Sequence, residues 1–191
     1  MRKWDMAQKH ERTHHPHPFN PDFDDHNSNF YRNFYKNYFI FTGLSHNLHN
    51  KSVIEVGPAK ISGLCFCKNY GDAYLIEPLI FEDTLVFYRE RGITIIHEPV
   101  ETCDLPKVNM VWMFNLLQHV IDPHIVIEKL KGCAEEIYFF EPIDVPTDEK
   151  HIHSLGESFF IEAFGAAVKK YKGMSIPGFH RADCVYGKYI V

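Results

Sequence analysis

The chain has 191 residues, 45% hydrophobic and 24% charged, with a formal net charge of −5 when its histidines are neutral. This length and apolar content suffice for one compact domain, no apolar run approaches the ~20 residues of a membrane span, and an acidic chain without a basic stripe is poorly suited to nucleic acid. Five cysteines, with one close pair at Cys65 and Cys67, favour reduced thiols and a cytoplasmic protein over a disulfide framework or a four-ligand zinc site.

The first 28 residues are predicted to form a loosely ordered arm. Five histidines occur between residues 10 and 26 among three prolines, a mixture that cannot propagate a helix and has few apolar groups to bury. Metal binding would also explain these histidines. We favour an arm without metal, because no second cluster completes a ligand geometry. Residues 1–11 are polar and mixed in charge, unlike a signal peptide.

Residue 29 begins a predicted single domain, 29–191, whose first segment, 29–50, is rich in aromatic residues. Seven aromatic side chains between Phe30 and Phe41 recur at helical spacing. This pattern predicts an N-terminal helix, most of whose rings pack on the core formed by residues 51–191.

A nucleoside-binding unit is predicted where a short strand, 53–56, ends in the turn that begins at Gly57. A second apolar run, 73–76, ends at Glu77, which follows Gly57 by 20 residues. A strand that stops sharply lets a ligand reach the backbone N–H groups of a following helix, and an acid on the neighbouring strand can accept hydrogen bonds from ribose hydroxyls. A plain α/β crossover has the same outline and stays an alternative.

The details of this turn separate two cofactors. A dinucleotide site requires glycines at three set positions, but Ala59 and Ser62 occupy the second and third, and Pro58 lacks an N–H. S-adenosylmethionine carries no phosphate, so its loop has only to pass beneath the amino acid and ribose. The stretch, with Glu55 ahead of the turn, resembles the first motif of class I S-adenosylmethionine-dependent methyltransferases, acid-x-Gly-x-Gly-x-Gly, with Ala59 in place of the second glycine.

The next predicted elements are an amphipathic helix over 79–91 and a strand over 93–97. The inward face of the helix is predicted to consist of Leu79, Phe81, Leu85, Val86 and Phe87. The run 101–106 (ETCDLP) resembles a turn that in this family often reads Gly-Asp-Ala-Glu-Asp-Leu-Pro and contacts the adenine. Alignment on its last three residues places Glu101 and Thr102 at the adenine edge.

A fourth strand is predicted over 108–114, because this apolar run is typical of a strand buried on both faces. The segment after it, 115–123 (NLLQHVIDP), resembles the Asn-Val-Leu-Glu-His-Val-x-Asp-Pro signature of the methyltransferases typified by ubiquinone and menaquinone biosynthesis enzymes. The resemblance implies that Asn115 and Leu116 line the methionine end of the cofactor and that His119 acts in catalysis at the acceptor pocket. A packing role for His119 stays open.

A helix over 125–131, a strand over 136–142, a loop at 151–157, a helix over 158–170 and a terminal strand over 183–191 complete the predicted order. This alternation predicts a Rossmann-like, doubly wound α/β fold, with a mostly parallel sheet and helices on both faces.

The resemblance implies methyl transfer from S-adenosylmethionine to a small molecule, sugar or lipid precursor, with oxygen slightly favoured as the acceptor atom. The implied cofactor-binding residues are Glu55, Gly57, Pro58, Ala59, Glu77, Pro78, Glu101, Thr102, Asn115 and Leu116, and no metal is expected. An inactive cofactor-binding protein or partner subunit is the main alternative. An NAD-dependent or nucleotide-sugar enzyme is less favoured, because the glycines and a Tyr-x-x-x-Lys pair are missing.

Overall fold

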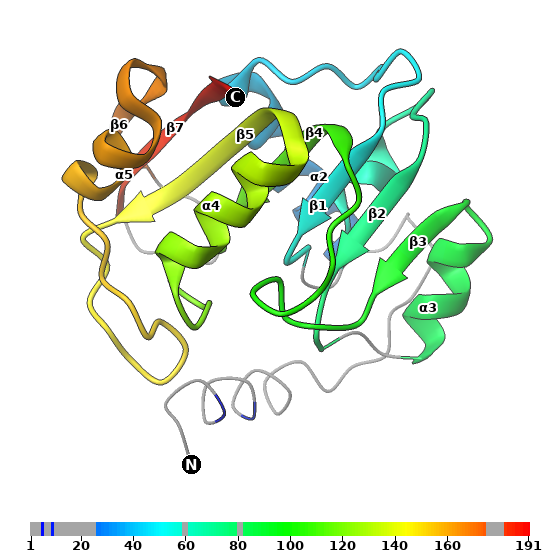
Figure 1. Ribbon diagram of the computed structural model, residues 1–191, viewed down its shortest axis with the longest axis horizontal. Helices are drawn as coiled ribbons and strands as arrows, with labels where there is room; N and C mark the ends of the chain where they lie inside the picture. Colours follow the sequence, from blue (N-terminus) through cyan, green and yellow to red (C-terminus); the bar gives the residue numbers. More distant parts are fainter. Residues whose placement is uncertain (1–4, 6–8, 10–25, 59–60, 80–81, 175–181) are drawn as a thin grey trace.

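A computed structural model of the chain describes residues 5, 9, 26–58, 61–79, 82–174 and 182–191. Its centre is a seven-stranded sheet with the strand order β3-β2-β1-β4-β5-β7-β6 (Figure 1). The strands are β1 (Val53–Val56), β2 (Ala73–Ile76), β3 (Ile93–Ile96), β4 (Val108–Phe114), β5 (Ala134–Ile143), β6 (Lys169–Met174) and β7 (Ala182–Ile190). The first five are parallel, whereas β7 runs antiparallel to both β5 and β6.

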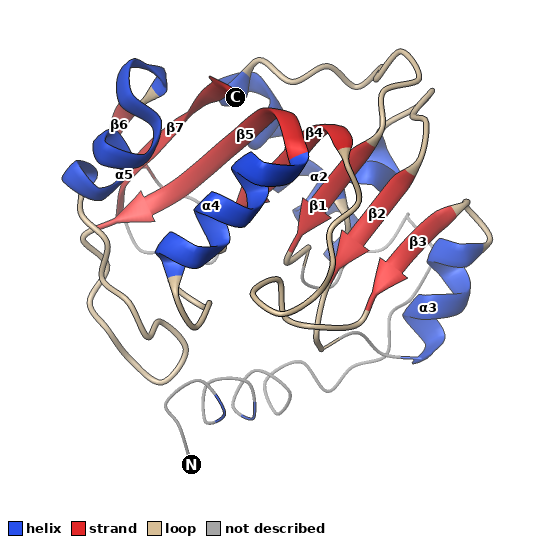
Figure 2. Ribbon diagram, viewed as in Figure 1, coloured by secondary structure: helices blue, strands red, loops and turns tan. Residues whose placement is uncertain are grey.

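Helices cover both faces of this sheet (Figure 2). They are α2 (His26–Thr42), α3 (Glu82–Arg89), α4 (Pro123–Cys133) and α5 (Glu157–Phe164), with the 3₁₀ turns η1 (Gly63–Phe66) and η2 (Gly165–Ala167). The buried side chains of α4 and α5 form one apolar cluster with the sheet, and those of α2, η1 and α3 form a second on the opposite face. The structure therefore confirms the predicted doubly wound, mostly parallel fold.

The strand β4 shows why the sheet has two cores. Val111 and Met113 lie in the cluster with α4, whereas Met110 and Trp112 lie in the cluster with α2. Because neighbouring side chains of a strand point to opposite faces, a strand covered by helices on both sides is apolar on both faces. The continuous apolar run 110–114 of the sequence is the direct result.

The helix expected after β1 is absent among the described residues of that crossover, which contain only the four-residue turn η1. The helix α2 packs on the same face of the sheet as this turn. Its Tyr38 ring stacks on Phe114 of β4 at a centroid distance of 4.8 Å, and Phe39 meets Trp112 edge-on at 5.4 Å. The predicted aromatic helix thus exists and packs most of its rings on the sheet.

Two other expectations about elements need correction. The helix predicted over 158–170 ends at Phe164, because Gly165 has a φ of +56° that breaks the helical path, and β6 follows as an unpredicted edge strand. In α3, Phe87 is buried as predicted and Leu85 is half-buried, but Val86 is 54% exposed and Tyr88 is buried. Phe81 lies outside the described residues.

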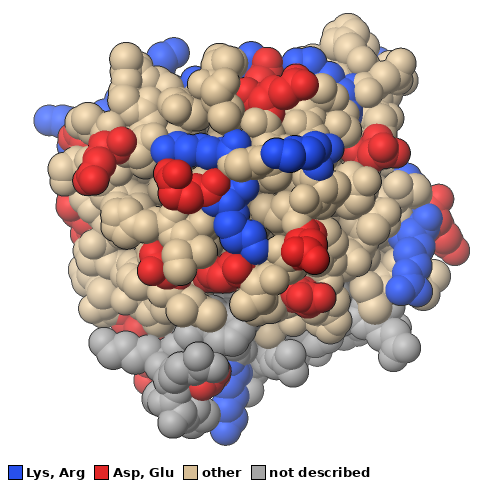
Figure 3. All heavy atoms as spheres, viewed as in Figure 1, with Lys and Arg blue, Asp and Glu red and all other residues tan. Residues whose placement is uncertain are grey.

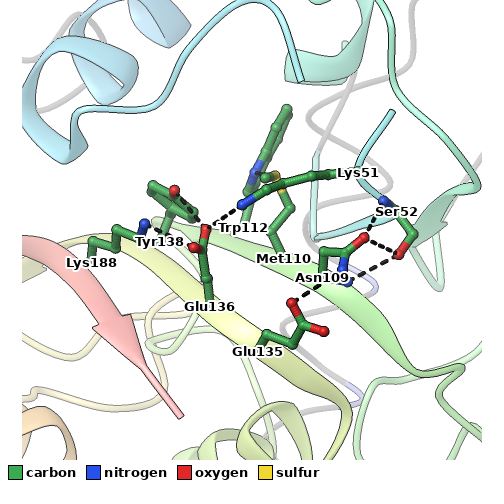
Figure 4. A network of polar contacts seen from close by, with 9 residues as sticks. All are labelled: Lys51, Ser52, Asn109, Met110, Trp112, Glu135, Glu136, Tyr138 and Lys188. Atoms are coloured by element: carbon green, nitrogen blue, oxygen red, sulfur yellow. Dashed lines mark hydrogen bonds and ion pairs between the residues drawn. The ribbon is translucent and has the colours of Figure 1, made fainter. Parts of the chain in front are cut away.

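A polar network ties the strands together at the edge where β1, β4 and β5 begin (Figure 4). Ser52 and Asn109 are joined by three hydrogen bonds of 2.9–3.0 Å, and the Asn109 amide donates to Glu135 at 3.1 Å. The Glu136 carboxylate lies 3.3 Å from the Lys51 ammonium and 2.9 Å from that of Lys188. This network lies where the parallel strands begin, at the opposite edge of the sheet from the one where they end.

Most of the predicted arm, 1–28, lies outside the described residues, and the division into an arm and one domain stays a prediction. No helix in the described part of the chain is long and apolar enough to cross a membrane.

Candidate functional site

The candidate site lies at the edge of the sheet where the parallel strands end. Register pairs Val56, the last residue of β1, with Ile76 of β2 and with Met113 of β4. Gly57, Glu77 and Asn115 therefore lie side by side along this edge. In the sheet, β1 lies between β2 and β4. The chain continues from β1 outward to β2 and β3 and later returns to β4 on the opposite side of β1. The ends of β1 and β4 therefore form the topological switch point, where ligands of such sheets bind.

Gly57 makes the sharp turn at the end of β1. Its φ is +65°, which a residue with a side chain rarely adopts, and its N–H donates to the Ile76 carbonyl at 2.9 Å. A Cβ at this position would lie 2.7 Å from Cδ1 of Leu116. The strand thus stops where the sequence predicts, the positive φ favours glycine at this position, and the Leu116 side chain lies against the turn.

Glu55 faces inward and braces the turn. Its carboxylate accepts hydrogen bonds from the Ser62 hydroxyl and from the Gly63 N–H, the latter at 3.1 Å. Burial raises the pKa of Glu55, while these hydrogen bonds oppose that rise. Pro58 is also buried, and its carbonyl accepts a 3.4 Å hydrogen bond from Tyr35 of α2. Both residues organise the loop in this structure, and Ala59 lies outside the described residues.

Glu77 lies directly beyond β2, next to the Gly57 turn. Its side chain is 8% exposed and accepts a hydrogen bond from the Leu79 N–H at 3.0 Å, which holds the carboxylate at the strand end. The carbonyl of Pro78 lies 2.9 Å from Nε2 of His97, beyond the neighbouring strand. The acid is thus fixed at the edge where a ribose would be bound in the predicted site.

The loop between β3 and β4 contains Glu101 and Thr102. This loop is hydrogen-bonded to the segment that follows β4. The Glu101 carboxylate accepts from the Ile121 N–H at 2.6 Å, and Lys129 of α4 donates to the Glu101 carbonyl at 3.0 Å. The Thr102 hydroxyl donates to the Pro99 carbonyl at 3.2 Å and is exposed. The structure gives both side chains partners within the protein, and an adenine contact for them stays a prediction.

Asn115 and Leu116 form the turn after β4, beside the switch point. Asn115 has a φ of +55°, and its side-chain oxygen accepts from Gln118 at 2.6 Å. The N–H of Leu116 donates to the Glu141 carboxylate at 2.8 Å, and that of Leu117 does so at 3.3 Å. Glu141, near the end of β5, thereby fixes the backbone at the start of the segment 115–123, whose sequence resembles the methyltransferase signature.

Sequence reasoning assigned no role to Glu141. It is 1% exposed, and burial raises its pKa to about 8 even though the two backbone N–H groups oppose that rise. The sequence did contain a signal for this residue, because Glu141 directly follows the apolar run 137–140. A carboxylate in a buried strand requires hydrogen-bond donors, such as backbone N–H groups.

Three histidines lie near this turn, one on the segment after β4 and two on the loop after β5. The ring centroids of His119 and His151 are 5.0 Å apart, and Nε2 of His153 is 2.9 Å from the Val120 carbonyl. Burial, with a smaller effect of His151, lowers the pKa of His119 to about 4, so this imidazole is neutral at neutral pH. Asp148, which sequence reasoning missed, lies 2.9 Å from the His151 ring.

Charges on the surface are mixed. Across the face drawn in Figure 3, Lys and Arg side chains lie next to Asp and Glu side chains. On α4, for example, Lys131 pairs with Glu128 at 2.9 Å. Among the described residues no three His, Cys, Asp or Glu side chains are placed to hold a metal ion.

No protein-family model and no curated protein matches the sequence. Several solved structures match it, some of them along nearly their whole length. The N-methyltransferase NodS from Bradyrhizobium japonicum, in complex with S-adenosyl-L-homocysteine, is 13% identical with a TM-score of 0.68, covering 97% of this chain and 98% of NodS. The [4+2]-cyclase SpnF is 9% identical with a TM-score of 0.71, over 100% and 97%.

A third similar structure is the 1,6-didemethyltoxoflavin-N1-methyltransferase from Burkholderia thailandensis, with its substrate and S-adenosylhomocysteine bound. It is 9% identical with a TM-score of 0.63, over 98% of this chain and 88% of that one. At such identities the likeness shows the fold alone, and the cyclase illustrates that one fold supports different reactions. The chain has the class I methyltransferase fold.

Proposed function

We propose that this protein transfers a methyl group from S-adenosylmethionine to a small-molecule acceptor. The observation that carries the proposal is the arrangement at the switch point, where the Gly57 turn of β1 lies beside Glu77 of β2 and the Asn115–Leu116 turn of β4. Support comes from NodS and the toxoflavin methyltransferase, which share the fold and were solved with S-adenosylhomocysteine.

In the proposed complex the cofactor crosses the ends of β1, β2 and β4. Glu77 accepts hydrogen bonds from the ribose hydroxyls, and the turn at Gly57 and Pro58 passes beneath the amino-acid end with Asn115 and Leu116 facing it. Pro78, Glu101 and Thr102 lie toward the adenine. Glu55 contributes by bracing the turn, since its hydrogen bonds are made to Ser62 and Gly63.

His119 is the proposed catalytic group. Its Nδ1 lies 3.2 Å from the Lys150 carbonyl, which favours the tautomer with the proton on that nitrogen and leaves Nε2 as the hydrogen-bond acceptor. A half-buried, neutral imidazole can orient an acceptor hydroxyl or amine for in-line attack on the methyl group. Oxygen remains the slightly favoured acceptor atom.

Binding calorimetry tests the proposal directly. We expect S-adenosylmethionine and S-adenosylhomocysteine to bind with micromolar affinity, about −8 kcal/mol, and NAD and NADP not to bind. Glu77→Ala should weaken cofactor binding by about 1.5–3 kcal/mol, roughly 10–150-fold, through loss of charge-assisted hydrogen bonds to the ribose.

Glu90→Ala is the matched control, because it removes an exposed acid beyond the far end of α3. It should bind the cofactor as the parent does. If Glu77→Ala also binds as the parent does, the assignment of Glu77 to the ribose is wrong. Cofactor binding without formation of S-adenosylhomocysteine from any acceptor would instead favour the inactive binding protein.

A further inference from the structure

The loop between β5 and α5 is held firmly against the turn that carries His119. The N–H groups of Ile152 and His153 both donate to the Gln118 carbonyl, at 2.9 and 3.3 Å, and Nε2 of His153 lies 2.9 Å from the Val120 carbonyl. The side chains of this loop therefore have defined positions relative to His119.

Within that loop Asp148 holds His151 in one orientation. One carboxylate oxygen of Asp148 accepts from the N–H groups of Lys150 and His151, at 2.7 Å each, and the other lies 2.9 Å from Nδ1 of His151. A proton on Nδ1 is therefore favoured, which makes Nε2 the basic nitrogen. Burial acts to raise the pKa of Asp148, but these hydrogen bonds outweigh it and bring the pKa down to about 2, so the carboxylate is charged whenever the imidazole is neutral.

The His151 ring in turn lies against His119, with ring centroids 5.0 Å apart and planes tilted by 51°. The charged groups that act on His119 are Asp148 and Lys150, which both lie on the same loop as His151. Two imidazoles this close repel each other when both are charged. The Asp148 carboxylate contacts the His151 ring, so a proton that arrives at His151 has a negative charge beside it.

We propose that Asp148, His151 and His119 form one proton-accepting unit for the transfer reaction, in which His119 orients the acceptor, His151 receives its proton and Asp148 positions His151. This inference rests on the proposed methyl transfer and narrows the acceptor to a hydroxyl or amine that loses a proton. The bond from the acceptor oxygen or nitrogen to the methyl carbon forms as the carbon–sulfur bond breaks, and its electron pair stays on sulfur. The acceptor proton passes to Nε2 of His151 and then to water.

A purely structural role for Asp148 predicts different behaviour. In that case the hydrogen bonds of Asp148 would serve only to shape the turn 148–151, and the protonation of His151 would not bear on turnover. The two readings are separated by measurements on the histidine rings themselves, followed by turnover as a function of pH.

The first measurement is an NMR titration of the ¹⁵N-labelled full chain, which reports tautomer and protonation of each ring. We expect neutral His151 to carry its proton on Nδ1, and we expect Asp148→Asn to shift the titration of His151 to lower pH, because it removes a charge that stabilises the imidazolium. His124→Gln, an exposed histidine of α4 packed on Phe159, is the control and should leave His151 unchanged. The proposed unit is overturned if neutral His151 carries its proton on Nε2, or if His151 titrates at the same pH in Asp148→Asn as in the parent.

The second measurement follows S-adenosylhomocysteine formation from S-adenosylmethionine with a panel of aliphatic alcohols, phenols and primary amines. His151→Gln should lower kcat by about 10²–10⁴, and Asp148→Asn should lower it less and move the acidic limb of the pH profile to lower pH, with unchanged affinity for S-adenosylmethionine. Asp148→Glu should restore the parent limb. Equal pH profiles of Asp148→Asn and parent overturn this inference alone, whereas a parent that does not bind S-adenosylmethionine in calorimetry overturns the proposed function.

Discussion

At the scale of single residues, two tyrosines of α2 show how differently buried hydroxyl groups are satisfied. Tyr35 and Tyr38 are 4% and 2% exposed and lie one turn apart on the same helix face. The Tyr35 hydroxyl donates to the Pro58 carbonyl at 3.4 Å and is also hydrogen-bonded to Glu55. The Tyr38 hydroxyl has no hydrogen-bond partner among the described residues.

This contrast predicts opposite effects of removing the two hydroxyls. Tyr38→Phe should leave the free energy of unfolding unchanged or raise it by about 1 kcal/mol, because a buried donor without a partner costs stability. Tyr35→Phe should lower it by about 1–2 kcal/mol, because the buried Glu55 loses a donor. Urea unfolding of the two variants beside the parent measures both, and a Tyr38→Phe variant as unstable as Tyr35→Phe would show that the hydroxyl is satisfied.

At the scale of elements, the short first crossover depends on how closely η1 approaches α2. A Cβ on Gly63 would lie 2.7 Å from two atoms of the Tyr35 ring and 3.4 Å from the Glu55 carboxylate. Both neighbours are buried and held by other contacts, so they cannot simply move away. The crossover can be this compact because glycine occupies the contact.

Gly63→Ala should therefore destabilise the protein by about 1–3 kcal/mol, the usual cost of overpacking a well-packed core. Gly132→Ala is the matched control, because it makes the same change in the last turn of α4, where an added Cβ meets nothing within 4 Å. That variant should be more stable than the parent by about 0.5–1 kcal/mol, since alanine favours the helix. Thermal unfolding of both variants is the measurement, and equal midpoints for the two would exclude the close contact of η1 with α2.

At the scale of the whole molecule, Glu141 couples folding to pH. Its pKa is about 8 in the folded protein against an ordinary value of 4.5, so between these pH values the folded state binds a proton that the unfolded state has released. The stabilising contribution is fully present below pH 4.5 and is lost as pH rises through about 8. His119 acts in the opposite direction, because its pKa falls from 6.5 to about 4 and its contribution is lost as pH falls through that range.

Comparing Glu141→Gln with the parent isolates the first effect. The difference in unfolding free energy between variant and parent should move in favour of the variant as pH rises from 5 to 8, by up to about 1.4 kcal/mol per pH unit, because glutamine cannot ionise and the other groups cancel in the difference. Urea unfolding at several pH values measures it. A difference that does not change with pH would mean that Glu141 is ionised in the folded protein.

The sequence by itself determined the five parallel strands and, within two residues, where each of them ends, but not the edge strand β6. Apolar runs ended by turn residues are local signals, and the alternation of strands with crossovers leaves few topologies open. Gly57, Glu77 and Asn115 could be placed at one edge on this basis alone, because the ends of parallel strands meet at the same edge.

Only the tertiary structure decided which of the implied site residues face that edge and which are held inside. Glu55 and Glu101 bond to groups 8 and 20 residues away, and Glu141 meets a backbone 25 residues before it, so no local pattern reveals their direction. The pairing of His151 with His119 likewise joins loops after different strands, although Asp148, three residues before His151, was a local sign. The helix expected after β1 is replaced in the described residues by the short turn η1, whose Ser62 hydroxyl and Gly63 N–H bond to the buried Glu55, a contact that local helix propensity does not reveal.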